Sequence, residues 1–355
     1  MADDRESMAA PRELGERKAT VLRIVVEEYV RTGEPVGSET IAERAQLSVS
    51  PATIRNELSA LEEMGYLGHP HTSAGRVPTD LGYRSFVNSL PAGRLRETQK
   101  RAISDFFAQT VMDLEETLVG ATQLLSRLTQ YAGLAVPPNA ADERVVHVEL
   151  VGVGSVILAL IVGQHGHVDK RTLDRPDGID DGELAELSDR LGRALAGRTA
   201  TDAEIEVLRM SANAPEPERS LIKGLADALA EMRNGQAGAH VLVRGVSNLA
   251  GEAATWRRET IQRLFEALER ESEMLSLLQT PPGDPEEDVH VTIGGEHPST
   301  EEWDAAIVSA NYRVGDTSLG TIGVVGPTRM DYVTAIATVR AIARRISELA
   351  TALDG

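Results

Sequence analysis

Ser50-Pro51-Ala52-Thr53-Ile54-Arg55-Asn56-Glu57-Leu58 is the stretch that decides the fold of the first part of this 355-residue chain. Serine is a preferred helix N-cap, and proline suits the first helical position because its missing N–H would have no partner there. The apolar residues of this segment recur at helical spacing, at Ile54, Leu58, Leu61 and Met64. Gly65 stands where a residue just past a helix end would stand. The segment therefore predicts a short, capped helix that buries one face.

The other face of this helix carries small and polar side chains, at Ala52, Arg55, Asn56 and Ser59. Such a face suits a DNA major groove, where arginine reads guanine, asparagine reads adenine, and small apolar groups meet the thymine methyl. We therefore expect Arg55 and Asn56 to read bases, and Ala52 or Thr53 to contact a methyl group. Ser50 and Thr53 can equally contact phosphates or only cap the helix. A purely structural helix in a protein-binding module is the alternative.

The flanking sequence predicts the rest of a winged helix-turn-helix domain over residues 12–90. Helices are expected at about 13–31 and 39–45 before the quoted stretch, and at 80–90 after it. Two short strands, at 66–70 and 76–78, enclose a tip of small polar residues, which is typical of a β-wing. In this wing we expect Thr72 and Ser73 to donate hydrogen bonds to phosphates and Arg76 to contact the DNA backbone. An ordinary hairpin turn is the alternative.

The remainder of the chain predicts an α+β fold with an interrupted antiparallel sheet. We expect one long helix at about 95–132, a linker at 136–140, and strands at 145–150, 155–162 and 167–173. Helices then dominate residues 180–278, including one at 255–278, with one strand-like run at 239–246. After an acidic loop at 281–288, strands return at 289–293, 305–314 and 320–325, and a helix at 331–353 follows. A sheet that begins before residue 175 and resumes after 288 indicates one domain with a helical insertion.

This pattern divides the chain into five parts. They are a disordered tail (1–11), the winged helix (12–90), a first part of the sheet domain with its linking helix (95–180), an inserted segment (181–280) and a second part of the sheet domain (288–355).

The composition narrows the classes of function. The net charge is −19, but residues 12–90 hold nine Arg or Lys against eleven Asp or Glu, so the winged helix is nearly neutral. This balance favours a few specific base contacts over bulk attraction to the DNA polyanion. The chain has no cysteine, which excludes disulfides, thiolate catalysis and Cys-ligated zinc. No catalytic constellation stands out, so we expect neither an enzyme nor a cofactor.

The sequence also bears on the cellular location of the protein and on metal binding. No apolar run reaches the roughly 18–20 residues that span a bilayer, and the polar N-terminus is unlike a signal peptide. We therefore expect a cytoplasmic protein with no membrane partner. Two His-x-His pairs, His69/His71 and His165/His167, lack further ligands nearby in the sequence, and two ligands do not make a metal site. We expect no bound metal.

Several of these motifs together resemble the heat-inducible transcription repressor family, HrcA. The resemblance is carried by the segments 33–38, 50–56, 61–67, 71–79 and 82–84, and again by Gly326-Pro327-Thr328-Arg329-Met330-Asp331-Tyr332. It implies a homodimeric repressor with a winged helix, a GAF-like domain and a dimerising segment inserted into that domain. It also implies binding to an inverted-repeat operator (CIRCE) upstream of chaperonin and related heat-shock operons, release on heat stress, and the chaperonin GroEL as a partner that keeps the repressor active.

The motif at 326–332 follows a strand and opens a helix. The simplest interpretation is a strand-to-helix corner in which Thr328 caps the helix and Arg329 pairs with an acidic neighbour. The alternative is a role for Thr328, Arg329, Asp331 and Tyr332 in signalling between domains, or an effector site. A small-molecule-gated regulator that uses the GAF-like domain as its sensor is accordingly the second hypothesis for the whole chain.

Overall fold

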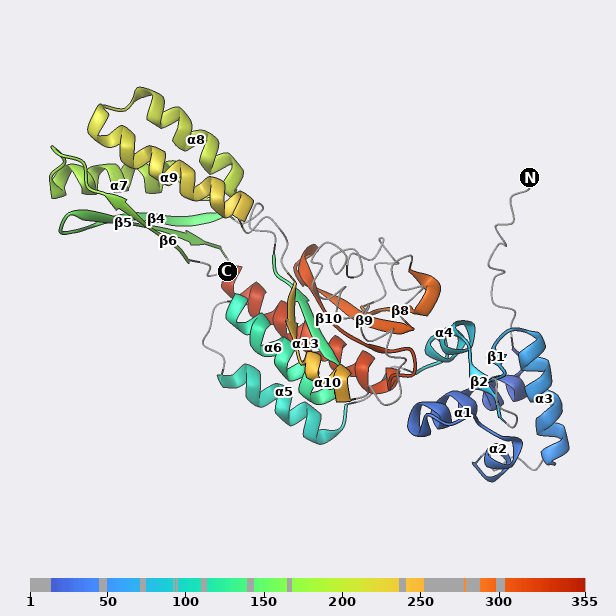
Figure 1. The fold of residues 1–355 in the computed structure, drawn as a ribbon. Helices are drawn as coiled ribbons and strands as arrows, with labels where there is room; N and C mark the ends of the chain where they lie inside the picture. Colours follow the sequence, from blue (N-terminus) through green and yellow to red (C-terminus); the bar gives the residue numbers. More distant parts are fainter. Residues whose placement is uncertain are drawn as a thin grey trace, which may run out of the picture.

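The computed structural model describes residues 14–44, 50–70, 75–91, 93, 95–109, 114–138, 144–164, 168–235, 241–251, 278, 288–297 and 304–354. Figure 1 shows three units in a row: an N-terminal unit of α1–α4, a central sheet with helices on it, and a second sheet covered by α7–α9. The tail at 1–11, the wing tip at 71–74, all but Leu278 of the helix expected at 255–278, and most of the acidic loop lie outside the described residues.

The N-terminal unit has the predicted winged helix-turn-helix arrangement. Its helices are α1 (Glu16–Thr32), α2 (Ser38–Arg44), α3 (Pro51–Glu63) and α4 (Asp80–Asn88), and its short antiparallel wing strands are β1 (Leu67–Gly68) and β2 (Val77–Pro78). Gly33 ends α1 in the left-handed conformation (φ 71°) and donates its N–H to the carbonyl of Tyr29, as helix-ending glycines do. Thr79 caps α4 through the N–H of Gly82 at 3.2 Å.

The prediction of a single helix at 95–132 is wrong. The structure has two helices, α5 (Glu97–Gln109) and α6 (Leu114–Thr129), and then a strand, β3 (Ala132–Val136), where we expected a helix end and a linker. The run Ala-Gly-Leu-Ala-Val is too short and apolar for its periodicity to separate a strand from a helix. Long-range pairing decides it, because β3 lies between β10 and β7. Gly133 allows this, since a Cβ there would come within 2.3 Å of the Thr122 carbonyl oxygen on α6.

The central sheet has five antiparallel strands in the order β7-β3-β10-β9-β8. Besides β3, they are β7 (Leu242–Arg244), β8 (His290–Ile293), β9 (Ala305–Val314) and β10 (Thr317–Pro327). Helices α6 and α13 (Tyr332–Asp354) pack on one face, with α5 against α13. Their shared apolar core is continuous with the core of the winged helix. A smaller cluster that includes Leu134, Ile307 and Val325 covers the other face. The remaining short elements are α10 (Val246–Gly251) and a 3-10 turn, η2 (Gly294–Glu296).

The strands β4 (Val145–Val153), β5 (Val156–Gly163) and β6 (Val168–Asp174) form a separate three-stranded sheet. Helices α7 (Asp181–Leu195), α8 (Ala200–Asn213) and α9 (Glu216–Gly235) complete this unit, which has its own core. We expected these strands to begin the sheet that resumes after residue 288, and the pairing corrects this. The excursion from the central sheet therefore spans 144–235 rather than 181–280, and the strand-like run at 239–246 returns the chain to the central sheet as β7. Sequence patterns identify strands but not their partners.

The α+β class with antiparallel sheets is confirmed. Among the helices that the structure describes, none combines the length and apolar character needed to cross a membrane.

Candidate nucleic-acid interface

Helix α3 forms as the sequence predicts. Ser50 adopts an extended backbone, and its Oγ accepts a hydrogen bond from the N–H of Thr53 at 3.2 Å. The two hydroxyl oxygens of Ser50 and Thr53 lie 3.1 Å apart. Ile54, Leu58 and Leu61 are buried on one side of the helix. Capping is thus an actual role of Ser50, and contact with a phosphate stays a prediction for both hydroxyls.

The opposite side of α3 is open. Ala52, Arg55, Asn56 and Ser59 are all exposed, and Thr53 is half-buried. The Arg55 guanidinium donates from Nε to the hydroxyl of Ser38 on α2, at 3.3 Å. The described residues give its two terminal nitrogens no other hydrogen bond. The Nε of Arg55 therefore has a partner within the protein, whereas the two terminal nitrogens, which can pair with guanine, are available.

Ion pairs hold the three helices of this unit in place. Glu57 on α3 lies 3.1 Å from Lys18 and 3.8 Å from Arg17, both on α1. Glu28, which is buried on α1, lies 3.0 Å from Arg44 on α2 and also pairs with Arg31. The hydrogen bond from Arg31 lowers the pKa of Glu28, and the charge of Arg44 adds to the effect. The pairs of Glu57 join α3 to α1 and the pair of Glu28 with Arg44 joins α1 to α2, beside the apolar core that the helices share.

In the wing, Arg76 has a different environment from the one expected. Its guanidinium pairs with Glu62 of α3, with Nε and Nη2 at 2.9 and 2.8 Å from the carboxylate, and its side chain is only 19% exposed. Nη1 lies 3.5 Å from Nδ1 of His69. Arg76 thus ties the wing to α3, and it can meet a phosphate only by sharing or exchanging this partner. Thr72 and Ser73 lie outside the described residues, as do His71, His165 and His167.

The C-terminal motif is a strand-to-helix corner between β10 and α13. Asp331, not Thr328, caps the helix, because its Oδ1 accepts the N–H of Thr334 at 3.1 Å. Thr328 instead donates its hydroxyl to Asp304 at 2.8 Å. The main-chain N–H of Asp331 also donates to the hydroxyl of Tyr131, at 2.8 Å. The predicted cap at Thr328 is therefore wrong. An N-cap side chain accepts the N–H of the residue three positions later, and because α13 begins at Tyr332, the N-cap is Asp331 and that residue is Thr334.

This corner also lies against the winged helix. The Tyr332 ring is 5.9 Å from the ring of Tyr83 on α4, and the Tyr332 hydroxyl donates to the carbonyl of Thr328 at 2.6 Å. Burial raises the pKa of both phenols well above the ordinary value. Arg329 reaches the turn after α1, since a Cβ on Gly33 would lie 2.9 Å from its Nη1. The motif therefore lies at the contact between the winged helix and the central domain.

The side chains of Asp80, Arg84 and Glu296 complete this contact, and none of the three was predicted as a site residue. Asp80 of α4 accepts the N–H of Gly295 at 3.0 Å, and burial raises its pKa. Arg84 of α4 donates from Nε to Glu296 at 2.7 Å and from Nη2 to the carbonyl of Val291 at 2.5 Å. The only sequence signal was that Arg84 belongs to one of the segments that carry the family resemblance. The partners lie more than 200 positions apart, so spacing alone does not link them.

Comparison with known families agrees with this geometry. Residues 13–90 match the family model described as "Winged helix-turn-helix transcription repressor, HrcA DNA-binding", and residues 115–336 match "HrcA protein C terminal domain". The chain belongs to the HrcA family. The first HrcA match contains α3, the wing and α4, and the second contains the central sheet, the inserted unit and the corner at 326–332.

Curated HrcA relatives extend over almost the whole chain. The heat-inducible transcription repressor HrcA of Thermobifida fusca is 39% identical, over 98% of this chain and 99% of its own length. That of Acidothermus cellulolyticus is 38% identical, over 95% and 98%. A crystal structure titled only as a hypothetical protein has a TM-score of 0.70 and 26% identity, and covers 96% of this chain and 100% of its own. The three-unit architecture is thus shared with a solved structure.

Proposed function

We propose that this chain is a sequence-specific repressor of heat-shock operons that binds an inverted-repeat DNA operator as a homodimer and releases it on heat stress. The observation that carries this proposal is the open face of α3. It presents Arg55 and Asn56, the two side-chain types that read guanine and adenine, on a helix locked into a winged helix-turn-helix.

The proposed contacts divide by role. Arg55 and Asn56 read base edges, Ala52 or Thr53 meets a thymine methyl, and Ser59 lies on the same exposed face. Ser50, Thr72, Ser73 and Arg76 supply contacts to the phosphate backbone. Because the chain carries a charge of −19, discrimination between sequences comes from the base contacts rather than from general attraction to DNA.

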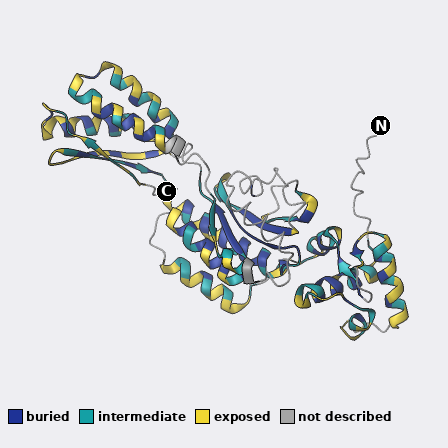
Figure 2. Ribbon diagram, viewed as in Figure 1, coloured by how far each residue is buried: buried dark blue, intermediate teal, exposed yellow. Residues whose placement is uncertain are grey.

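The homodimer is supported by the second sheet. Among the described elements, helices cover one face of this sheet and none covers the other (Figure 2). On the other face the central strand β5 presents a row of partly exposed apolar residues, Val156, Leu158, Leu160 and Val162. A strand that is apolar on both faces is typical of a sheet buried on both sides. We therefore assign the uncovered face to a second copy of this chain.

Exposed valines extend this surface onto the neighbouring strands. Val151 and Val153 of β4 and Val168 of β6 are 38%, 56% and 52% exposed. Their cross-strand partners on β5 are Leu158, Val156 and Val162. The paired residues give one contiguous apolar patch, which isolated soluble chains seldom leave open. A two-fold dimer through this patch predicts a palindromic operator with its half-sites separated by whole helical turns.

The remaining parts of the proposal rest on the family. They are a GAF-like character of the central domain, the chaperonin GroEL as a partner, action in the cytoplasm, and regulation without catalysis. Heat would act by loosening the contacts between the central domain and the winged helix or between the two copies. The corner at 326–332 supports the first route, because Tyr332 and Arg329 both lie against the winged helix.

A mobility-shift titration tests the proposal. The full-length chain is titrated onto an inverted-repeat operator, one isolated half-site and a scrambled duplex, with and without chaperonin, at several temperatures. We expect tight binding to the inverted repeat only, higher active fraction with chaperonin, and release on heating. Equal affinity for the half-site and the inverted repeat would contradict the dimer, and equal affinity for the scrambled duplex would contradict sequence-specific repression.

A further inference from the structure

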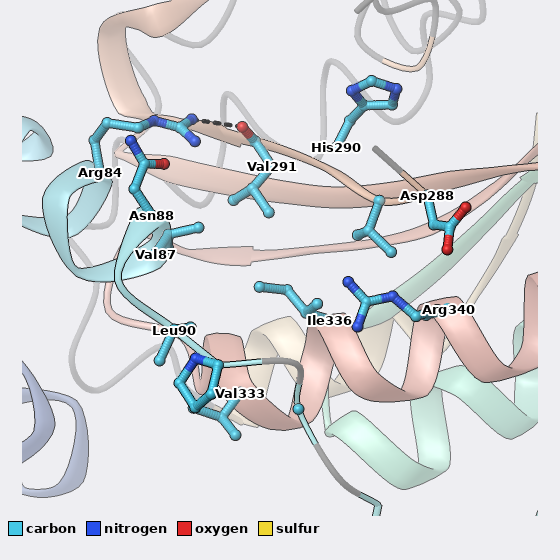
Figure 3. Close-up of a pocket in the computed structure, with 13 residues that line it drawn as sticks. Arg84, Val87, Asn88, Leu90, Asp288, His290, Val291, Val333, Ile336 and Arg340 are labelled. Atoms are coloured by element: carbon cyan, nitrogen blue, oxygen red, sulfur yellow. Dashed lines mark hydrogen bonds between the residues drawn. The ribbon is translucent and has the colours of Figure 1, made fainter. Parts of the chain in front are cut away.

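A cavity of about 430 Å³ lies at the border between the winged helix and the central domain. Helix α4 forms one wall, with Arg84, Val87 and Asn88, while β8 and α13 form the other. Figure 3 shows Arg340 of α13 extending toward this space, and His290 pointing away from it on the opposite side of β8 from Val291. The volume is within the range of small-molecule sites, about 300–1,000 Å³.

The cavity continues along α13. A second cavity of about 300 Å³ shares Asp288, His290 and Arg340 with the first, and adds Arg313 of β9 and Arg344 of α13. The two together form a groove that we call the α13 groove. It runs from the winged helix along α13 toward the C-terminal half of that helix.

The α13 groove is cationic in a strongly acidic chain. Among the residues that the structure describes, its lining includes four arginines and one carboxylate, Asp288. Arg84 is engaged with Glu296, and Arg344 with Glu348. For the guanidinium groups of Arg340 and Arg313, the described residues offer neither an ion pair nor a hydrogen bond. Two arginines thus lie in a concave surface with no ion pair or hydrogen bond to their guanidinium groups from the described residues, and Asp288 is the carboxylate that lines the groove with them.

The first cavity also has an apolar wall, beside the polar residues Asn88, His290 and Asp288. Val87 and Leu90 come from the end of the winged helix, Val291 from β8, and Val333 and Ile336 from the first turns of α13. Guanidinium groups bind phosphate oxygens through paired hydrogen bonds. An apolar wall beside them suits a planar or hydrocarbon group. The combination matches a ligand that carries phosphate at one end and an apolar body at the other.

We propose that the α13 groove binds an organic phosphate of nucleotide size, with its phosphates on Arg340 and Arg313 and its apolar part against α4 and β8. The site lies at the border of the central domain rather than inside its sheet core. Because its walls belong to both units, an occupant fixes the angle between the winged helix and the central domain. On the basis of the proposed repressor function, the ligand changes the affinity for operator DNA, and DNA changes the affinity for the ligand by the same factor.

The first experiment measures ligand binding without DNA. The full-length chain is titrated with ATP, ADP and inorganic phosphate by calorimetry, in parallel with the variants Arg340→Gln, Arg313→Gln and the control Arg193→Gln. Arg193 is exposed on α7, and within the described part of the chain its side chain donates to the carbonyl of Asp189 alone. We expect each nucleotide, ATP or ADP, to bind the Arg193→Gln control with the same affinity as the unmodified chain. Each groove variant should lose about tenfold or more in affinity. Thermal unfolding curves confirm that each variant folds.

Three results would overturn this assignment. They are no binding of ATP or ADP at millimolar concentration, equal affinity of the groove variants and the control, and inorganic phosphate binding as tightly as the nucleotides. The last would show that the apolar wall contributes nothing. A separate operator titration with and without ATP tests the coupling, which an unchanged operator affinity would refute. Failure of the chain to bind any operator would instead refute the repressor function and leave the ligand titration valid.

Discussion

Replacing Arg55 by alanine removes the side chain to which we assign guanine reading. A bidentate arginine–guanine contact contributes about 1–3 kcal/mol of discrimination. A homodimer on an inverted repeat uses two copies of Arg55, so the full operator should lose about 2–6 kcal/mol, which is roughly 30-fold or more in affinity. A single half-site should lose half of this free energy. The doubling is a signature of the two-fold arrangement.

The folded state should tolerate this change. Arg55 is exposed, and its one described hydrogen bond, to Ser38 at 3.3 Å, lies where water can replace it. The Ser50 cap and the buried residues of α3 are untouched. We therefore expect the free energy of unfolding to change by no more than about 0.5 kcal/mol. Thermal unfolding of the variant checks that a loss of binding is not a loss of fold.

Fluorescence anisotropy at one fixed salt concentration measures the effect. The Arg55→Ala variant and the unmodified chain are titrated onto the operator and onto duplexes with each base pair of a half-site replaced in turn. We expect the variant to lose discrimination at one position per half-site and to keep it elsewhere. Arg193→Ala, which removes the same charge from α7, should bind normally. A uniform loss across all duplexes would show that Arg55 contacts the backbone, and an unchanged profile would remove it from the interface altogether.

Three further predictions follow from the same geometry. Leu160→Lys places a charge on the uncovered face of the second sheet, so sedimentation at micromolar concentration should show monomers; a persistent dimer would exclude this face. Glu28 has a lowered pKa, so its stabilising charge is present above the ordinary value of 4.5 and is lost as the pH falls below it. The melting-temperature difference between Glu28→Gln and the unmodified chain should therefore shrink on acidification from pH 7, and a pH-independent difference would contradict this. Gly82→Ala brings a Cβ to 2.2 Å from the Tyr66 carbonyl oxygen, so calorimetry should show a loss of about 1–3 kcal/mol or more. Gly15→Ala meets nothing within 4 Å and should melt nearly as the unmodified chain does.

The winged helix could be predicted from the sequence because its signals are local. The Ser50 cap, the apolar spacing through Leu61 and the cap at Thr79 each act within a few residues, and the structure contains all three. The exposed face of α3 follows from the same spacing. Helical periodicity fixes which side chains share a face, whatever the rest of the chain does. The central strands β8, β9 and β10 were likewise predicted close to their observed limits.

Only the tertiary structure decided which strands pair and which side chains meet across the domains. The run 132–136 is a strand because β10 and β7 pair with it, and β4–β6 leave the central sheet because they pair only with one another. Arg76 is occupied by Glu62, and Arg84 reaches Glu296 across 212 positions. Hydrogen-bond partners and ion pairs depend on distances in space, which a one-dimensional pattern does not contain. The sequence by itself thus determined the exposed face of α3, to which we assign DNA reading, and the fold determined how the winged helix is joined to the central domain.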